Sequence, residues 1–120
     1  MNRESLREFC LSKAGVTECL PFDENTLVFK VSGKMFLLTD LLDEFSMNVK
    51  CNPEKAVELR EQYPCVTPGY HMSKVHWNTV LIDGSLSDQL LRNWIDDSYR
   101  LVVASLPLKD RKLLSAMNRD

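Results

Sequence analysis

The chain has 120 residues, of which 44% are hydrophobic and 27% charged, and its formal net charge is −2. This length predicts one domain, spanning residues 1–120, that buries its own core without metal or disulfide support. The acidic balance argues against an obligate, high-affinity nucleic-acid binder, because such proteins usually carry a basic excess, although it leaves room for a local basic patch.

The first half of the chain predicts one helix followed by a run of short strands. Asn2 is a suitable cap for a helix that ends near Gly15. Alternation of apolar and polar residues then predicts strands at residues 17–22, 26–32, 34–41 and 45–51, in chain order. The short loops between these strands favour an antiparallel meander.

The second half predicts two further helices of substantial length around another strand. Asn52-Pro53 is a strong helix start, with a capping residue followed by proline at the first helical position. A long strand is expected over residues 74–82, with a short strand before it. Ser87 then caps a long helix, and a shorter helix ends the chain.

This order of elements predicts an α+β fold in two layers. An antiparallel sheet of five to six strands would carry the helices on one face, in the order α, three or four β, α, one or two β, α. The other face of such a sheet stays open to water or to a partner.

The strand expected over residues 74–82 carries the densest polar chemistry. If it is regular, Lys74, His76 and Asn78 point to the open face, and Trp77 points to the core. We interpret this row of a cation, an imidazole and an amide as a candidate binding row, with an ordinary solvated face as the alternative.

Motifs for catalysis or metal binding are weak. His71 and His76 are five residues apart, so on one continuous strand they would point to opposite faces, and no third ligand stands at a standard offset. The four cysteines contain no C-x-x-C pair, and the glycines are too scattered for a phosphate-binding loop. We therefore expect free thiols, no metal and no cofactor, and the sequence gives no positive sign of an enzyme.

Targeting signals are also weak. The first residues, M-N-R-E-S-L-R-E, include acids where a signal peptide has an apolar run, and no apolar stretch approaches the roughly 18 residues of a membrane span. The expectation is a cytoplasmic protein that does not enter a membrane.

One segment closely resembles the signature of the MmcQ/YjbR-like proteins: Pro68-Gly69-Tyr70-His71-Met72-Ser73-Lys74-Val75-His76-Trp77-Asn78-Thr79-Val80. Further matches, including Gly33-Lys34-Met35-Phe36 and Asp83-Gly84-Ser85-Leu86, extend the likeness over nearly the whole chain. The resemblance implies a two-layer fold with a double-wing arrangement and a DNA-binding role. The positions that match the family's motif are Lys34, His71, Lys74, His76, Trp77 and Asn78.

Two functions remain open from the sequence. In the first, hairpins around Gly33 and Gly69 act as wings on DNA, His76 and Asn78 touch sugars or base edges, and phosphates meet Lys30, Lys34, Lys50 and Lys74. In the second, a small ligand or a protein partner occupies a polar pocket lined by His71, His76, Asn78 and Tyr99, and a weak enzyme with a histidine as acid or base would be a variant of this hypothesis. Lysines gathered on one surface favour DNA. The candidate site residues of both hypotheses are Lys34, Tyr70, His71, Lys74, His76, Asn78 and Tyr99.

Overall fold

The computed structural model describes residues 1–69 and 72–117. Its elements are α1 (Arg3–Leu11), β1 (Val16–Cys19), β2 (Thr26–Val31), β3 (Lys34–Asp40), β4 (Ser46–Lys50), α2 (Pro53–Gln62), β5 (Val66–Pro68), β6 (Trp77–Leu81), α3 (Asp88–Ala104) and α4 (Leu108–Met117).

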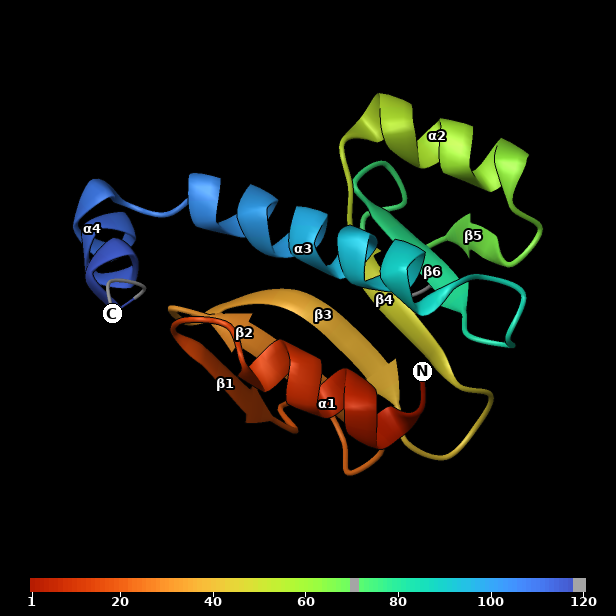
Figure 1. Ribbon diagram of the computed structural model, residues 1–120, viewed down its shortest axis with the longest axis horizontal. Helices are drawn as coiled ribbons and strands as arrows, with labels where there is room; N and C mark the ends of the chain where they lie inside the picture. Colours follow the sequence, from red (N-terminus) through yellow and green to blue (C-terminus); the bar gives the residue numbers. More distant parts are fainter. Residues whose placement is uncertain (70–71, 118–120) are drawn as a thin grey trace.

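The strands form one six-stranded sheet in the order β1-β2-β3-β4-β6-β5, and each neighbouring pair is antiparallel. Figure 1 shows α1 and α3 lying across the same side of this sheet, with α2 beside β5 and β6. The predicted α+β architecture, with helices on one face of an antiparallel sheet, is therefore confirmed.

Helix starts follow the capping residues in the sequence. The side chain of Asn2 accepts a hydrogen bond from the Ser5 backbone N–H, and the Asn2 backbone N–H donates to the Ser5 hydroxyl oxygen, which forms a capping box. Asn52 caps α2, with Pro53 at its first position, and Ser87 caps α3. The end of α1 was predicted too late, because the helix stops at Leu11 and a turn precedes β1.

The β2–β3 hairpin has the expected two-residue turn. Ser32 and Gly33 have φ angles of 47° and 83°, the left-handed region that tight hairpins require at both positions. The register shifts between Phe29 and Lys30, where the partner strand holds the additional residue Phe36. Phe36 and Leu37 consequently both lie in the helix-covered core, so the strict alternation predicted for this strand is wrong.

The main core lies between the sheet and the helices. It includes Leu6 and Cys10 of α1, Leu91, Trp94 and Ile95 of α3, and Phe29, Val31, Met47, Val49 and Val80 of the strands. A smaller cluster of Val28, Leu38 and Trp77, with half-buried Cys19, Met35 and Met72 against it, occupies the opposite face of the sheet.

Ser98 of α3 connects two central strands at the point where their pairing ends. Its hydroxyl donates to the Phe36 carbonyl at 2.5 Å and accepts from the Lys50 backbone N–H at 2.8 Å. The side chain is fully buried, so both strand groups depend on it instead of on water. Ser98 thus fixes α3 on β3 and β4.

Replacing Ser98 with alanine should lower the free energy of unfolding by about 1–3 kcal/mol, because a buried carbonyl and a buried N–H lose their partner. Urea denaturation followed by circular dichroism measures this loss. The exposed Ser105, whose hydroxyl bonds only the local Val102 carbonyl, offers the matched control Ser105→Ala. Equal stability of the two variants would contradict the bridging role.

Candidate functional site

The signature segment enters the sheet later than predicted. Residues 73–76 form a turn in which the N–H groups of His76 and Trp77 both donate to the Ser73 carbonyl, at 3.2 and 2.9 Å. Strand β6 therefore begins only at Trp77. Lys74 and His76 are exposed in this turn and do not belong to a strand row.

The two faces of β6 are opposite to the prediction. Trp77 is buried, but it belongs to the cluster on the face without helices, and Val80 belongs to the helix-covered core. Asn78 is 1% exposed and lies beneath α2. The predicted assignment of Asn78 to the open face and Trp77 to the helix-covered core is therefore wrong. Alternation shows only that the two side chains lie on opposite faces, and it does not show whether the amide is exposed to water or buried with partners inside the protein.

Asn78 is part of a network that connects β6, α2 and the turn. Its side-chain N–H₂ donates to the Ala56 carbonyl at 3.3 Å, and its side-chain oxygen accepts from Arg60 Nε at 2.8 Å. Arg60 also donates to the Lys74 carbonyl at 2.7 Å. One guanidinium thus holds both the strand and the turn that presents Lys74 and His76. We infer that Asn78 and Arg60 position this turn.

Gly69, which follows β5, is required by close approach to Trp77. Its N–H donates to the Trp77 carbonyl at 2.8 Å. A Cβ atom at this position would lie 2.7 Å from Trp77 Cβ and 2.9 Å from the Trp77 carbonyl oxygen. Glycine therefore lets the two strands of the signature meet here.

Tyr99, which was predicted to line the polar pocket, bonds a different part of the chain. Its hydroxyl donates to the Ala14 carbonyl at 2.6 Å, and its ring meets Phe36 edge-on at 5.4 Å between centroids. Burial raises the pKa of this hydroxyl, which keeps it a neutral donor. Asn78 and Tyr99 bond to different elements, and His76 is exposed. Tyr70 and His71 lie outside the described residues.

Lysines gather at one end of the sheet, which we call the basic end. Lys30 lies on the face without helices, because it is two residues after Val28, which belongs to the cluster on that face. Lys50 lies on the same face, because it is paired with Trp77, which belongs to the same cluster. Lys34 opens β3 at the same end, and the turn before Trp77 adds two further groups. The basic end comprises Lys30, Lys34, Lys50, Lys74 and His76.

Acids gather at the other end of the sheet, which we call the acidic end. The β1–β2 and β3–β4 turns both lie there, because β1 and β3 run in the same direction and are joined through β2. Their carboxylates are Asp23, Glu24, Asp43 and Glu44, all exposed. Among the acids of the described strands, Asp40 is the one that lies on the open face, because it is two residues after Leu38 of the cluster on that face. Asp40 is also at the acidic end.

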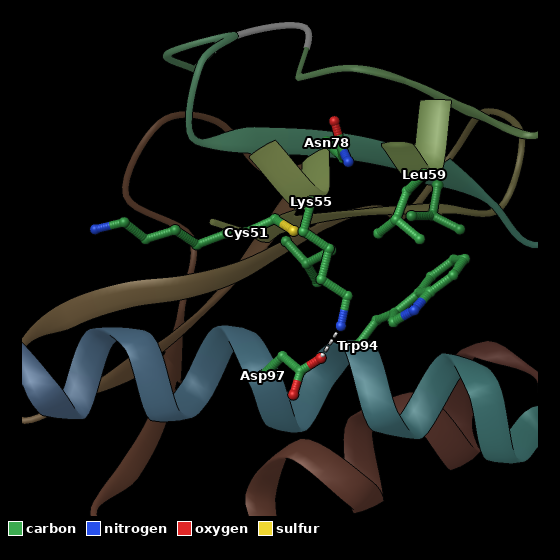
Figure 2. Close-up of a pocket in the computed structure, with 9 residues that line it drawn as sticks. Cys51, Lys55, Leu59, Asn78, Trp94 and Asp97 are labelled. Atoms are coloured by element: carbon green, nitrogen blue, oxygen red, sulfur yellow. Dashed lines mark hydrogen bonds and ion pairs between the residues drawn. The ribbon is translucent and has the colours of Figure 1, made fainter. Parts of the chain in front are cut away.

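A narrow cavity lies between α2, α3 and the sheet (Figure 2). It has a volume of about 10 Å³, which suits about one water molecule, and its wall includes Asn78 and Trp94. An adjoining open groove of about 260 Å³ is lined by Lys55, Asp97 and Arg100. Both cations pair with Asp97, at 3.2 and 3.3 Å, so this single carboxylate balances one of the two positive charges that line the groove.

The four cysteines, Cys10, Cys19, Cys51 and Cys65, carry free thiols. Burial raises the pKa of Cys10 to about 12 and also raises that of Cys51, so both thiols stay protonated at neutral pH and are poor nucleophiles. Among the residues described, no group of three or more histidines, cysteines or acids is placed to hold a metal ion. No helix of the described chain is long and apolar enough to cross a bilayer.

The fold and signature define a small α+β protein with a six-stranded antiparallel sheet and one largely open face. A family model described as YjbR matches residues 11–101, so the chain belongs to the YjbR family.

Relatives and solved structures agree with this membership. The uncharacterised protein YbdF of Escherichia coli O157:H7 is 38% identical over 117 residues, covering 93% of this chain and 96% of YbdF. The uncharacterised protein YjbR of Escherichia coli K12 is 34% identical over 115 residues, covering 95% and 98%. The crystal structure of the Deinococcus radiodurans protein DR2400, with a DUF419 domain, is similar at a TM-score of 0.88 and 38% identity, covering 93% of this chain and 86% of that one. A Pseudomonas syringae protein gives a TM-score of 0.74 at 28% identity, covering 84% and 98%.

Proposed function

We propose that this protein binds DNA through the basic end of its sheet. The observation that carries the proposal is the segregation of charge: Lys30, Lys34 and Lys50 share one end with the Lys74–His76 turn, and the strand acid of that face lies at the other end. A surface of this kind can neutralise several phosphates in spite of a net charge of −2.

The hairpin turns supply the geometry. The β2–β3 turn lies at this end of the sheet with Lys34 beside it, and the turn before β6 is held by Arg60. Two hydrogen-bonded turns at one end of a sheet suit the backbone of a duplex, where contacts to phosphate fix orientation. Asn78 is not part of this surface, because its amide is buried and bonded within the protein.

The mode of binding follows from the residue types. The lysine side chains meet phosphates as separate charges, the His76 ring supplies a hydrogen-bond donor, and the described residues of the basic end include no arginine that could form a bidentate contact with a base edge. We expect weak binding with little sequence preference, with a dissociation constant of about 10⁻⁴ to 10⁻⁶ M near physiological salt.

Charge reversal at the basic end tests this proposal. Fluorescence anisotropy of a labelled duplex should show binding by the wild-type protein that weakens steeply between low and moderate salt. The double variant Lys30→Glu with Lys50→Glu should bind every duplex more weakly and lower the slope of log affinity against log salt by about two, one per lost phosphate contact.

The matched control is Arg92→Glu, an exposed cation on α3 at the helix-covered face. It should leave the salt slope unchanged. Absence of wild-type binding at low salt with tens of micromolar protein, on the scale expected for non-specific complexes, would reject the proposal. Equal loss in the double variant and in the control would reject the assigned surface.

The alternative, a small-ligand or protein-binding domain, would need a site elsewhere. The three predicted lining residues that the structure describes are not brought together: Asn78 lies beneath α2, Tyr99 bonds Ala14, and His76 is exposed. Charge segregation therefore favours the DNA proposal over this one.

A further inference from the structure

Bulky apolar side chains are exposed on the two turns of the acidic end. Phe22 is 63% exposed, Leu20 is 48% exposed and Leu42 is 71% exposed. The exposed acids of the same two turns are their close neighbours in sequence. We call residues 20–24 and 42–44 the turn patch. Clustered exposure of large apolar groups within a charged rim is typical of an interaction surface.

The turn patch is held rigidly by its own hydrogen bonds. The Asp23 carboxylate accepts from the N–H groups of Asn25 and Thr26, both at 2.8 Å. The Asp40 carboxylate accepts from Leu42 and Asp43, at 2.8 and 3.0 Å. The Leu41 N–H donates to the Asn25 carbonyl at 2.8 Å, which joins the turns to each other. Preorganised turns lose little conformational entropy when a partner binds.

Helix α4 exposes a surface of the complementary kind. Leu108 and Leu113 are each 57% exposed and Met117 is 58% exposed. Lys109 and Lys112 line a shallow groove with Leu108 and Leu113. We call this surface the α4 face. It combines apolar groups with positive charge, whereas the turn patch combines them with negative charge.

The two surfaces cannot meet within one chain. Leu114, on the buried side of α4, packs against Gly15 at the start of β1. The turn patch begins at the other end of that strand, after Cys19. In Figure 1, α4 lies at the far left, away from the turns that follow β1 and β3. Any contact between these surfaces therefore joins two molecules.

We propose that a second copy of this chain docks its α4 face against the turn patch. Apolar groups then cover Phe22 and Leu42, while lysines of the helix meet the acids of the turns. Pairing two turn patches by a twofold axis would instead bring acid against acid, which is unfavourable. The contact joins different surfaces, so it is heterologous and adds copies head to tail until a ring closes.

Sedimentation velocity across a concentration series, from low micromolar to near millimolar protein, tests the contact in the full chain. The weight-average mass should rise with concentration past that of a dimer, and the rise should shrink in high salt. Phe22→Ser combined with Leu42→Ser should abolish the rise. A wild-type protein that stays monomeric throughout the series would overturn the proposal.

A charge swap identifies the two partners. Variant A carries Glu24→Lys, Asp43→Lys and Glu44→Lys, which make the turn patch positive, and variant B carries Lys109→Glu and Lys112→Glu in α4. Each variant alone should remain monomeric, because its two surfaces then have the same sign of charge. An equal mixture of A and B should associate again. The unchanged lysines on α4 of variant A can pair with the unchanged acids in the turn patch of variant B, and the new lysines in the turn patch of A can pair with the new glutamates on α4 of B.

The control variant carries Glu58→Lys and Glu61→Lys on the exposed side of α2. It should associate as the wild type does. Circular dichroism verifies that each variant is folded. Association of A or B alone at the wild-type level, or failure of the mixture to associate while both are folded, would show that these surfaces do not form the contact.

Discussion

Trp77→Ala should lower the free energy of unfolding by about 3–5 kcal/mol, the range for removing a buried large aromatic side chain. Trp77 is 7% exposed and packs with Val28 and Leu38 in the small cluster on the face without helices. No helix covers that face, so the indole supplies much of the cover for the strands beneath it. Total stability of a domain this size is about 5–15 kcal/mol, so the variant loses a large part of it.

Urea denaturation followed by far-ultraviolet circular dichroism measures the loss, since the second tryptophan complicates fluorescence. Trp77→Phe, which keeps an aromatic ring of smaller area, should fall between wild type and Trp77→Ala. A loss below about 1 kcal/mol for the alanine variant would mean that this cluster contributes little to the free energy of unfolding.

Arg60→Met should lower the free energy of unfolding by about 2–4 kcal/mol, because the guanidinium bonds two acceptors and one of them, the Asn78 side-chain oxygen, is buried away from water. The Asn78 side-chain oxygen and the Lys74 carbonyl both lose their donor, while the methionine keeps most of the apolar stem. The turn from Ser73 to His76 should also loosen. Hydrogen exchange at the Trp77 N–H, which closes that turn, should accelerate more than exchange in α3.

Arg60→Lys is the informative conservative change. A single ammonium lacks the planar fork that reaches both acceptors, so this variant should lie between wild type and Arg60→Met. Arg92→Met, on the exposed surface of α3, controls for loss of a cation. Equal stability of Arg60→Met and Arg92→Met would show that the hydrogen bonds of Arg60 to Asn78 and Lys74 do not stabilise the fold.

Most elements of the fold were predictable from local signals. Asn52-Pro53 and Ser87 cap the helices they were expected to cap, and alternation located β1 to β4. These signals depend on a few neighbouring residues. The bulge at Phe36 had no such signal, because it lies in a continuous apolar run where either face is compatible with the sequence.

The candidate site was predictable only in part. Lys34, Lys74 and His76 are exposed, as a binding surface requires, but Asn78 and Tyr99 are engaged inside the protein. Their partners, Arg60 and Ala14, are distant in sequence, and a polar residue at an alternating position does not reveal whether water or a helix faces it. The gathering of Lys30 and Lys50 at one end needed the strand register, which only the fold supplies.

The separation of charge between the two ends of the sheet has a consequence for the kinetics of encounter. The ends are about 20 Å apart, the length of a six-residue strand such as β2, whereas charges are screened over about 8 Å at physiological ionic strength. A large polyanion close to the protein therefore acts on one end at a time, and the net charge of −2 does not describe what it meets. The resulting torque turns the lysines toward the polyanion and the carboxylates away from it before contact, so that productive orientation is reached during approach.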